Sequence, residues 1–170
     1  GELNAAATSY EQALKNRPSF AEAHCNLGNI RNEKGELDAA IDCYKHALKY
    51  KPDYAEAYNN MGLTLKDVGE LDAAIESLKQ AIKINPDFED AYSNLGHTLK
   101  GVAFSRPIPD LIEIILDLLN RQYYVRPIDV SRAGISLLKF LPEIDQLLKN
   151  SSLENSKQFL DQSLLDNFYL

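Results

Sequence analysis

Apolar residues recur at every third or fourth position through most of the chain, in short segments separated by glycine, proline or asparagine. Residues 55–88 contain two such segments, joined by Gly69-Glu70 and followed by Pro86. This spacing puts the apolar side chains on one face of an α-helix. Proline ends such a segment because it cannot continue the hydrogen-bond ladder. The pattern predicts helix–turn–helix units and an all-α fold.

The unit at residues 55–88 recurs when the sequence is shifted by 34 residues in either direction. A helix–turn–helix period of this length is typical of a stacked solenoid. Small residues repeat where two helices must approach closely, and each helix pair leaves an apolar face that only the next repeat can cover. The recurring positions are Gly28, Gly62 and Gly96; Asn26, Asn60 and Asn94; Ala40 and Ala74; Ala47 and Ala81; Pro18, Pro52 and Pro86.

At these residues the chain resembles the tetratricopeptide repeat (TPR) family. The resemblance implies a right-handed helical solenoid in which the first helices of the repeats line a concave surface and the second helices form the convex one. We expect this array to cover residues 1–101, as a half-repeat at 1–20, full repeats at 21–54 and 55–88, and a half-repeat at 89–101.

The 34-residue register ends after Gly101, so residues 102–170 are expected to form a separate C-terminal helical extension. A proline-broken connector at 104–109 precedes a helix predicted over residues 110–122. Further helices are predicted after Asp129, after Pro142, and from Ser151 to about Phe168. The first helix of the extension is expected to cap the open end of the solenoid.

Asparagine occurs once per repeat at Asn26, Asn60 and Asn94. Its side chain carries a donor and an acceptor, so a column on the concave surface can bond to both polar groups of an extended peptide backbone. The column is similar to that of the O-linked N-acetylglucosamine transferases, which implies a grip on protein substrates by their backbone. The alternative is that the same amides bond to neighbouring helices. The candidate peptide- or partner-binding residues are Asn26, Asn29, Asn59, Asn60, Lys66, Asn94, His97 and Lys100.

The TPR resemblance also implies that Cys25 faces the groove, at a position where chaperone-binding TPR proteins carry a lysine. Asp90 and Asn94 stand where those proteins carry two further cations. A C-terminal carboxylate would lack its charge-assisted partners here. The sequence therefore disfavours a chaperone tail as the ligand.

The formal net charge is −7 and basic residues are not clustered, which disfavours nucleic acid as a partner. No apolar stretch reaches the roughly 20 residues that a membrane span needs. Cys25 and Cys43 lack the spacing of a metal or redox pair, which favours reduced thiols and a cytoplasmic location. We find no catalytic motif. We therefore expect a protein that is not an enzyme and needs no cofactor or metal.

The leading hypothesis is a scaffold module that binds an extended peptide or a partner helix in the concave groove. A second hypothesis is the substrate-recruiting arm of a larger glycosyl- or methyltransferase, truncated at both ends. A third is self-assembly into a homo-oligomer through exposed terminal helices, because the half-repeat at residues 1–20 lacks a partner helix.

Overall fold

The computed structural model describes residues 1–100, 102–105, 108–120, 133, 134, 136 and 137. Contacts divide the chain into two units, Gly1–Thr98 and Leu99–Leu170. The secondary structure of the described residues is helical, without strands, which confirms the all-α prediction. The helices are α1 (Glu2–Asn16), α2 (Ala21–Glu33), α3 (Leu37–Tyr50), α4 (Ala55–Asp67), α5 (Leu71–Ile84), α6 (Glu89–Leu99) and α7 (Pro109–Asn120).

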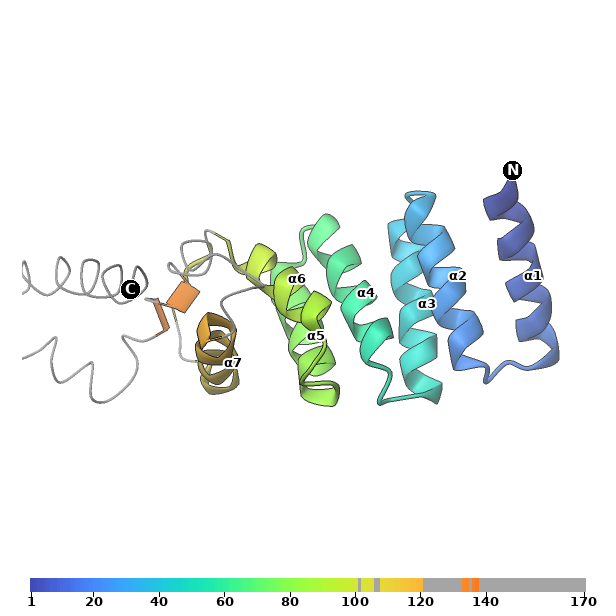
Figure 1. The fold of residues 1–170 in the computed structure, drawn as a ribbon. Helices are drawn as coiled ribbons and strands as arrows, with labels where there is room; N and C mark the ends of the chain where they lie inside the picture. The colour runs from blue at the N-terminus through green and yellow to red at the C-terminus, as the bar shows by residue number, and fades with distance from the viewer. Residues whose placement is uncertain (101, 106–107, 121–132, 135, 138–170) are drawn as a thin grey trace, which may run out of the picture. The chain divides into compact units, whose positions relative to one another are not determined.

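Helices α1 to α6 form the predicted solenoid (Figure 1). Consecutive helices pack against each other in the pairs α1–α2, α2–α3, α3–α4 and α4–α5, and α2 also contacts α4. The first helices of consecutive repeats, α2 and α4, are therefore neighbours. Because each repeat packs on the next, the apolar face of one helix pair is covered by the adjacent pair.

The two tight turns inside the repeats depend on glycine. Gly35 and Gly69 have φ angles of 75° and 87°, in the left-handed region that glycine adopts without strain. Glu36 N–H donates to the Arg31 carbonyl at 2.9 Å, and Glu70 N–H donates to the Leu65 carbonyl at the same distance. These bonds, which end α2 and α4, are those of a Schellman motif, so the recurring glycine fixes the direction of the second helix.

The recurring small residues lie where helices touch, as predicted. A β-carbon on Gly62 would lie 2.8 Å from Leu78 Cγ and 3.2 Å from the Ala74 carbonyl oxygen. One on Gly28 would lie 2.7 Å from the ring of Tyr44. The repeat alanines Ala40, Ala47, Ala74 and Ala81 have no solvent exposure. Their size permits the close packing on which the stack depends.

The second unit contains α7, in agreement with the helix predicted after the proline-broken connector. Leu111, Ile112, Ile114 and Ile115 are buried, and a β-carbon on Gly134 would lie 3.6 Å from Ile115. Phe104 N–H donates to Ser136 Oγ at 2.8 Å. The helices predicted after Pro142 and from Ser151 onward lie outside the described residues, as does most of the one predicted after Asp129.

Candidate functional site

Asparagine side chains link the first helices of successive repeats. Asn60 Nδ2 on α4 donates to Asn29 Oδ1 on α2 at 3.0 Å. Asn94 Nδ2 on α6 donates to Asn59 Oδ1 at 2.9 Å, and Asn59 Nδ2 donates to Asn60 Oδ1 at 3.1 Å. These four residues form a continuous chain of amide hydrogen bonds from α2 to α6, which we call the asparagine ladder.

Neighbouring hydroxyl groups extend this polar network. Tyr44 Oη on α3 donates to Asn29 Oδ1 at 2.9 Å, and Asn26 Nδ2 donates to Tyr10 Oη on α1 at 3.1 Å. Thr64 Oγ1 lies 3.1 Å from Asn32 Oδ1, which adds another link between α4 and α2. The structure thus shows the amides bonded to neighbouring helices, and a role in binding a peptide stays a prediction.

The predicted site residues differ in accessibility. Asn26, Asn29, Asn60 and Asn94 are half-buried, whereas Asn59 is buried, with an exposed fraction of 6%. The exposed sides of α2, α4 and α6 are referred to below as the first-helix face. On this face Lys66 is half-buried and His97 is exposed, with its Nδ1 2.8 Å from the Ser93 carbonyl oxygen. Lys100, in the second unit, is exposed.

The expectation that Cys25 faces the groove is wrong. Its exposed fraction is 2%, and it belongs to a core cluster with Ala40, Tyr44 and Ala57. Its position on α2 turns it towards α3 and the next repeat, because a first helix must cover two neighbours at once. Burial raises the pKa of its thiol to about 11, so the group is neutral and unreactive near pH 7.

Two histidines from different helices, His24 on α2 and His46 on α3, lie together. The rings of His24 and His46 stack with centroids 5.2 Å apart, and the ring of Tyr50 lies 5.8 Å from His24 on centroids. The antiparallel pairing of α2 and α3 brings the start of the first helix beside the end of the second. The contact between the two histidines could therefore have been predicted from the helix–turn–helix pattern of the sequence. The His24 ring also bonds to the Pro18 carbonyl oxygen through Nε2 at 2.9 Å.

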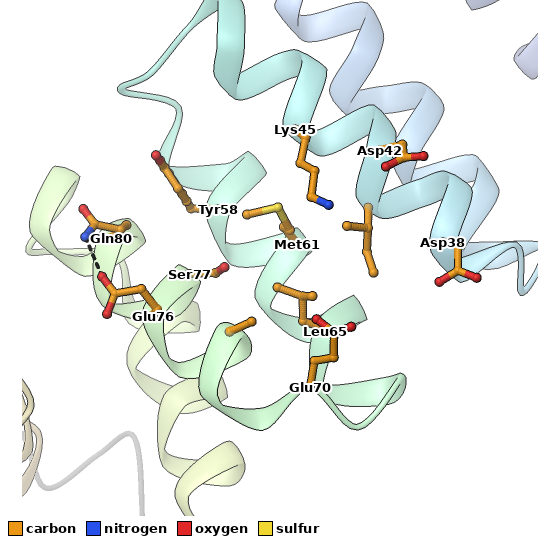
Figure 2. Close-up of a pocket in the computed structure, with 12 residues that line it drawn as sticks. Asp38, Asp42, Lys45, Tyr58, Met61, Leu65, Glu70, Glu76, Ser77 and Gln80 are labelled. Carbon is orange, nitrogen blue, oxygen red and sulfur yellow. Dashed lines mark hydrogen bonds between the residues drawn. The ribbon is translucent and has the colours of Figure 1, made fainter. Parts of the chain in front are cut away.

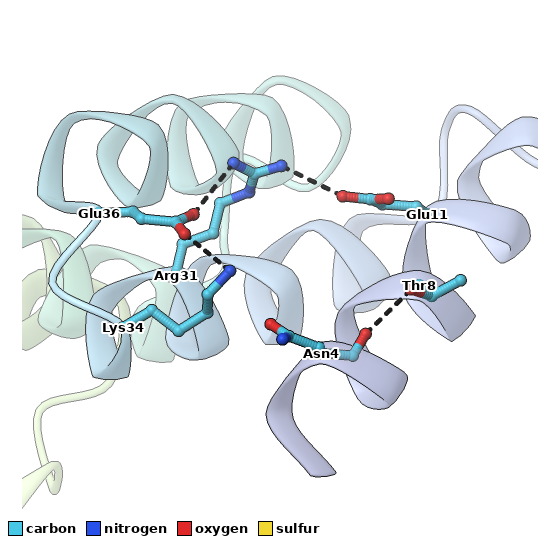
Figure 3. A network of polar contacts seen from close by, with 6 residues as sticks. All are labelled: Asn4, Thr8, Glu11, Arg31, Lys34 and Glu36. Atoms are coloured by element: carbon cyan, nitrogen blue, oxygen red, sulfur yellow. Dashed lines mark hydrogen bonds and ion pairs between the residues drawn. The ribbon is translucent and has the colours of Figure 1, made fainter. Parts of the chain in front are cut away.

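Ion pairs centred on Arg31 hold α1 against the first full repeat (Figure 3). The Arg31 guanidinium contacts Glu11 Oε1 on α1 at 3.2 Å and Glu36 Oε2 at 3.5 Å, while Lys34 Nζ contacts Glu36 Oε1 at 2.7 Å. The hydrogen bond from Lys34 and the charge of Arg31 lower the pKa of Glu36. This network links the half-repeat at residues 1–20 to the first full repeat, so we assign these charged residues a structural role.

A hollow of about 540 Å³, which we call the α3–α5 groove, lies between the second helices of the two full repeats (Figure 2). Sequence reasoning did not find it. No pattern in the sequence indicates it, because a hollow depends on the space left between two helices. The residues lining the groove include Asp38, Ile41, Asp42, Lys45, Tyr58, Met61, Leu65, Glu70, Ala73, Glu76, Ser77 and Gln80.

No helix within the described ranges is long and apolar enough to cross a membrane. Among the same residues, no three histidine, cysteine or acidic side chains gather as they would around a metal ion.

Comparison with known proteins agrees with the architecture. The family described as TPR repeat matches residues 1–31, 28–69 and 65–101. A mutant O-GlcNAc transferase from Thermobaculum terrenum is 27% identical, with a TM-score of 0.60, over 71% of this chain and 23% of that one. Two structures of MamA are each 22% identical over 98% of this chain and 88% or 82% of theirs, with TM-scores of 0.58 and 0.57. No curated protein matched.

Proposed function

The chain belongs to the tetratricopeptide repeat family, whose repeats serve in protein interaction and scaffolding, and we propose that it binds an extended peptide or a partner helix on the first-helix face. Candidate contacts on this face are Asn26, Asn29, Asn60, Lys66, Asn94 and His97, while the buried Asn59 donates to Asn60. Lys100, which belongs to the second unit, stays a separate prediction from the sequence. The asparagine ladder is the observation that carries the proposal.

The ladder supports a backbone-binding role because its amides keep unused hydrogen-bonding capacity. An asparagine amide offers two N–H donors and two acceptor lone pairs. Within the described part of the chain, Asn60 uses one N–H towards Asn29 and one lone pair towards Asn59. Because the side chain is half-buried, we expect its second N–H and second lone pair to meet a peptide C=O and N–H.

The same hydrogen bonds fix the amides before a ligand arrives. A side chain that is already held in one rotamer loses less entropy on binding, where ordering a mobile one costs about 0.5–1.5 kcal/mol. A peptide hydrogen bond contributes about 0.5–1.5 kcal/mol net, so bonds to three repeats add a few kcal/mol. These bonds alone give an affinity in the millimolar range, so we expect side-chain contacts to supply the rest of the binding free energy.

Selection from phage-displayed random peptides, followed by variant binding, tests this proposal. The selected peptides should lose affinity for Lys66→Ala, which removes a positive charge from the helix that carries Asn59 and Asn60. The matched control is Lys45→Ala, which removes the same side chain from the α3–α5 groove. If the affinity of the peptides is unchanged by Lys66→Ala but falls with Lys45→Ala, the peptides bind in the α3–α5 groove and not on the first-helix face.

A second candidate function is the substrate-recruiting arm of a larger transferase. The likeness to the O-GlcNAc transferase favours it, and the chain spans only 23% of that protein's length. Sequencing the gene beyond the codon for Leu170 tests this alternative. A reading frame that continues into a nucleotide-sugar-binding domain would support it, and a stop codon at that point would contradict it.

Two further expectations belong to the proposal. Cys25 and Cys43 are free thiols, which supports a cytoplasmic location, and cell fractionation tests it. Leu3 on α1 has an exposed fraction of 40%, and α1 has no buried residue, which supports self-association through this helix. Light scattering that shows only monomer at high concentration would exclude the homo-oligomer.

A further inference from the structure

The α3–α5 groove combines an apolar floor with an acidic rim. Its floor is built from Ile41 on α3, Met61 and Leu65 on α4, and Ala73 on α5. Ile41 and Leu65 belong to one core cluster, against which Met61 and Ala73 pack while remaining partly exposed. The floor is therefore apolar surface, continuous with the core, that a ligand can reach.

Four carboxylates surround this floor, from Asp38, Asp42, Glu70 and Glu76, against the single ammonium group of Lys45. In Figure 2 the two aspartates lie on α3, while Glu76 lies across the groove on α5. All four acidic residues are exposed. The two sides of the groove thus present negative charge to anything that enters it.

One of these carboxylates is already paired. Glu76 accepts hydrogen bonds from Lys79 Nζ and Gln80 Nε2, each at 2.8 Å. Partial burial raises the pKa of Glu76, but these two bonds outweigh it and hold the pKa below its usual value. Asp38, Asp42 and Glu70 form no ion pair with other described residues. The uncompensated charge of the rim therefore comes from these three.

The groove and the first-helix face lie on different sides of α4. Tyr58, Met61 and Leu65 are spaced three and four residues apart, which places them on one side of the helix, towards the groove. Asn59, one residue after Tyr58, and Lys66, one after Leu65, lie a third of a turn away in the direction of the first-helix face. A ligand in the groove leaves the asparagine ladder accessible.

We propose that the α3–α5 groove is a second docking site, and that it binds a basic amphipathic helix of a partner protein. The apolar side of such a helix would cover the floor, and its lysine or arginine residues would face Asp38, Asp42 and Glu70. Charge complementarity selects this occupant. A second copy of this chain, with a net charge of −7, is a less suitable occupant of this acidic groove, whatever contacts α1 makes elsewhere.

The test uses the full chain and a fluorescein-labelled model peptide of leucine, alanine and lysine, about 14 residues long to match the roughly 21 Å of α3. A second peptide has glutamate in place of each lysine. Fluorescence anisotropy measures binding of both. The lysine peptide should bind, with an affinity that falls as salt screens the exposed charges. The glutamate peptide should not bind.

Variants locate the site. The combination Asp38→Asn, Asp42→Asn and Glu70→Gln should weaken binding of the lysine peptide about tenfold, since exposed charges have modest effects that accumulate. Ala73→Arg, which fills the floor and adds a positive charge, should weaken it at least as much. The control combination Glu2→Gln, Asp53→Asn and Glu113→Gln makes the same change in net charge at exposed positions outside both the groove and the first-helix face. It should leave the affinity within about twofold.

Circular dichroism first establishes that each variant keeps its helical content. The proposal is overturned if the lysine peptide does not bind, or if neutralising the rim leaves its affinity unchanged. It is also overturned if the control combination weakens binding equally, because attraction would then follow net charge and not the groove. These outcomes are independent of the first-helix face, whose own test relies on Lys66.

Discussion

Replacing Gly62 tests the packing that builds the solenoid. A β-carbon here would lie 2.8 Å from Leu78 Cγ and 3.1 Å from Leu78 Cδ2, and Leu78 has no exposed surface into which to move. The Ala74 carbonyl oxygen, 3.2 Å away, belongs to the backbone of α5, so it can move only if the helix moves with it. The new side chain must therefore push α4 and α5 apart.

The size of the effect follows from two opposing contributions. Alanine at a helix position gains about 1 kcal/mol over glycine, while overpacking a core costs about 1–3 kcal/mol. Gly62→Ala should therefore lower the free energy of unfolding by up to about 2 kcal/mol. Gly62→Leu adds three more carbon atoms at the same point, and we expect a loss above about 3 kcal/mol.

Thermal unfolding followed by circular dichroism measures this loss. A chain of this size shifts its Tm by about 2–4 °C per kcal/mol, so Gly62→Leu should lower Tm by about 6 °C or more. Asp67→Leu is the matched control, since it adds leucine at an exposed position of the same helix. It should change stability by less than about 0.5 kcal/mol. Equal melting curves for Gly62→Leu and the native chain would refute the packing argument.

Other changes have equally definite consequences. Asn60→Ala should lower the free energy of unfolding by about 1–3 kcal/mol, because the buried Asn59 Nδ2 loses its acceptor, and urea unfolding measures it. A thiol reagent at pH 8 should modify Cys43 before Cys25, as mass spectrometry of peptides can show. Since the folded state holds the Cys25 proton more tightly, stability should decline as pH rises from 9.0 to about 11, and the decline should be smaller in Cys25→Ala, where Cys43, Tyr44 and Tyr54 still contribute. Deleting residues 123–170 should leave the helical signal of α1 to α6 intact, because solenoid contacts are local.

The repeat period predicted the solenoid because each recurring residue had one geometric reason to recur. Gly69 allows a left-handed turn, and Gly62 and Ala74 allow two helices to touch. These requirements are local to one helix pair. The half-repeat at residues 1–20 was predicted from the same period, and in the structure α1 packs against α2.

The candidate site was harder to predict, since its contacts join different repeats. Nothing in the spacing of Asn60 told us that its amide bonds to Asn29 on the preceding first helix. The asparagine column was visible, but its partners depend on how closely the first helices approach. The sequence alone gives no reason for Asn60→Ala to affect stability, whereas the hydrogen bonds of the ladder do.

Cys25 and the α3–α5 groove show a different limit. Whether a helix position faces solvent or the next repeat depends on the rotation between repeats, which the period alone does not contain. A shift of one position separates the buried Cys25 from the half-buried Asn26. The groove likewise depends on the space left between α3 and α5, and the residue types on the two helices do not predict how large that space is.

The most direct test of the account observes the side-chain amides of the ladder during binding. Two-dimensional ¹⁵N–¹H spectra of the labelled chain resolve each asparagine NH₂ group, and single Asn→Gln substitutions assign them. On addition of a peptide selected by phage display, the account predicts that the NH₂ signals of Asn60 and Asn94 shift at the same concentrations that saturate binding. The account is contradicted if binding saturates while the NH₂ signals of Asn60 and Asn94 do not shift. In that case only backbone amide signals of groove residues such as Ala73 and Ser77 would change.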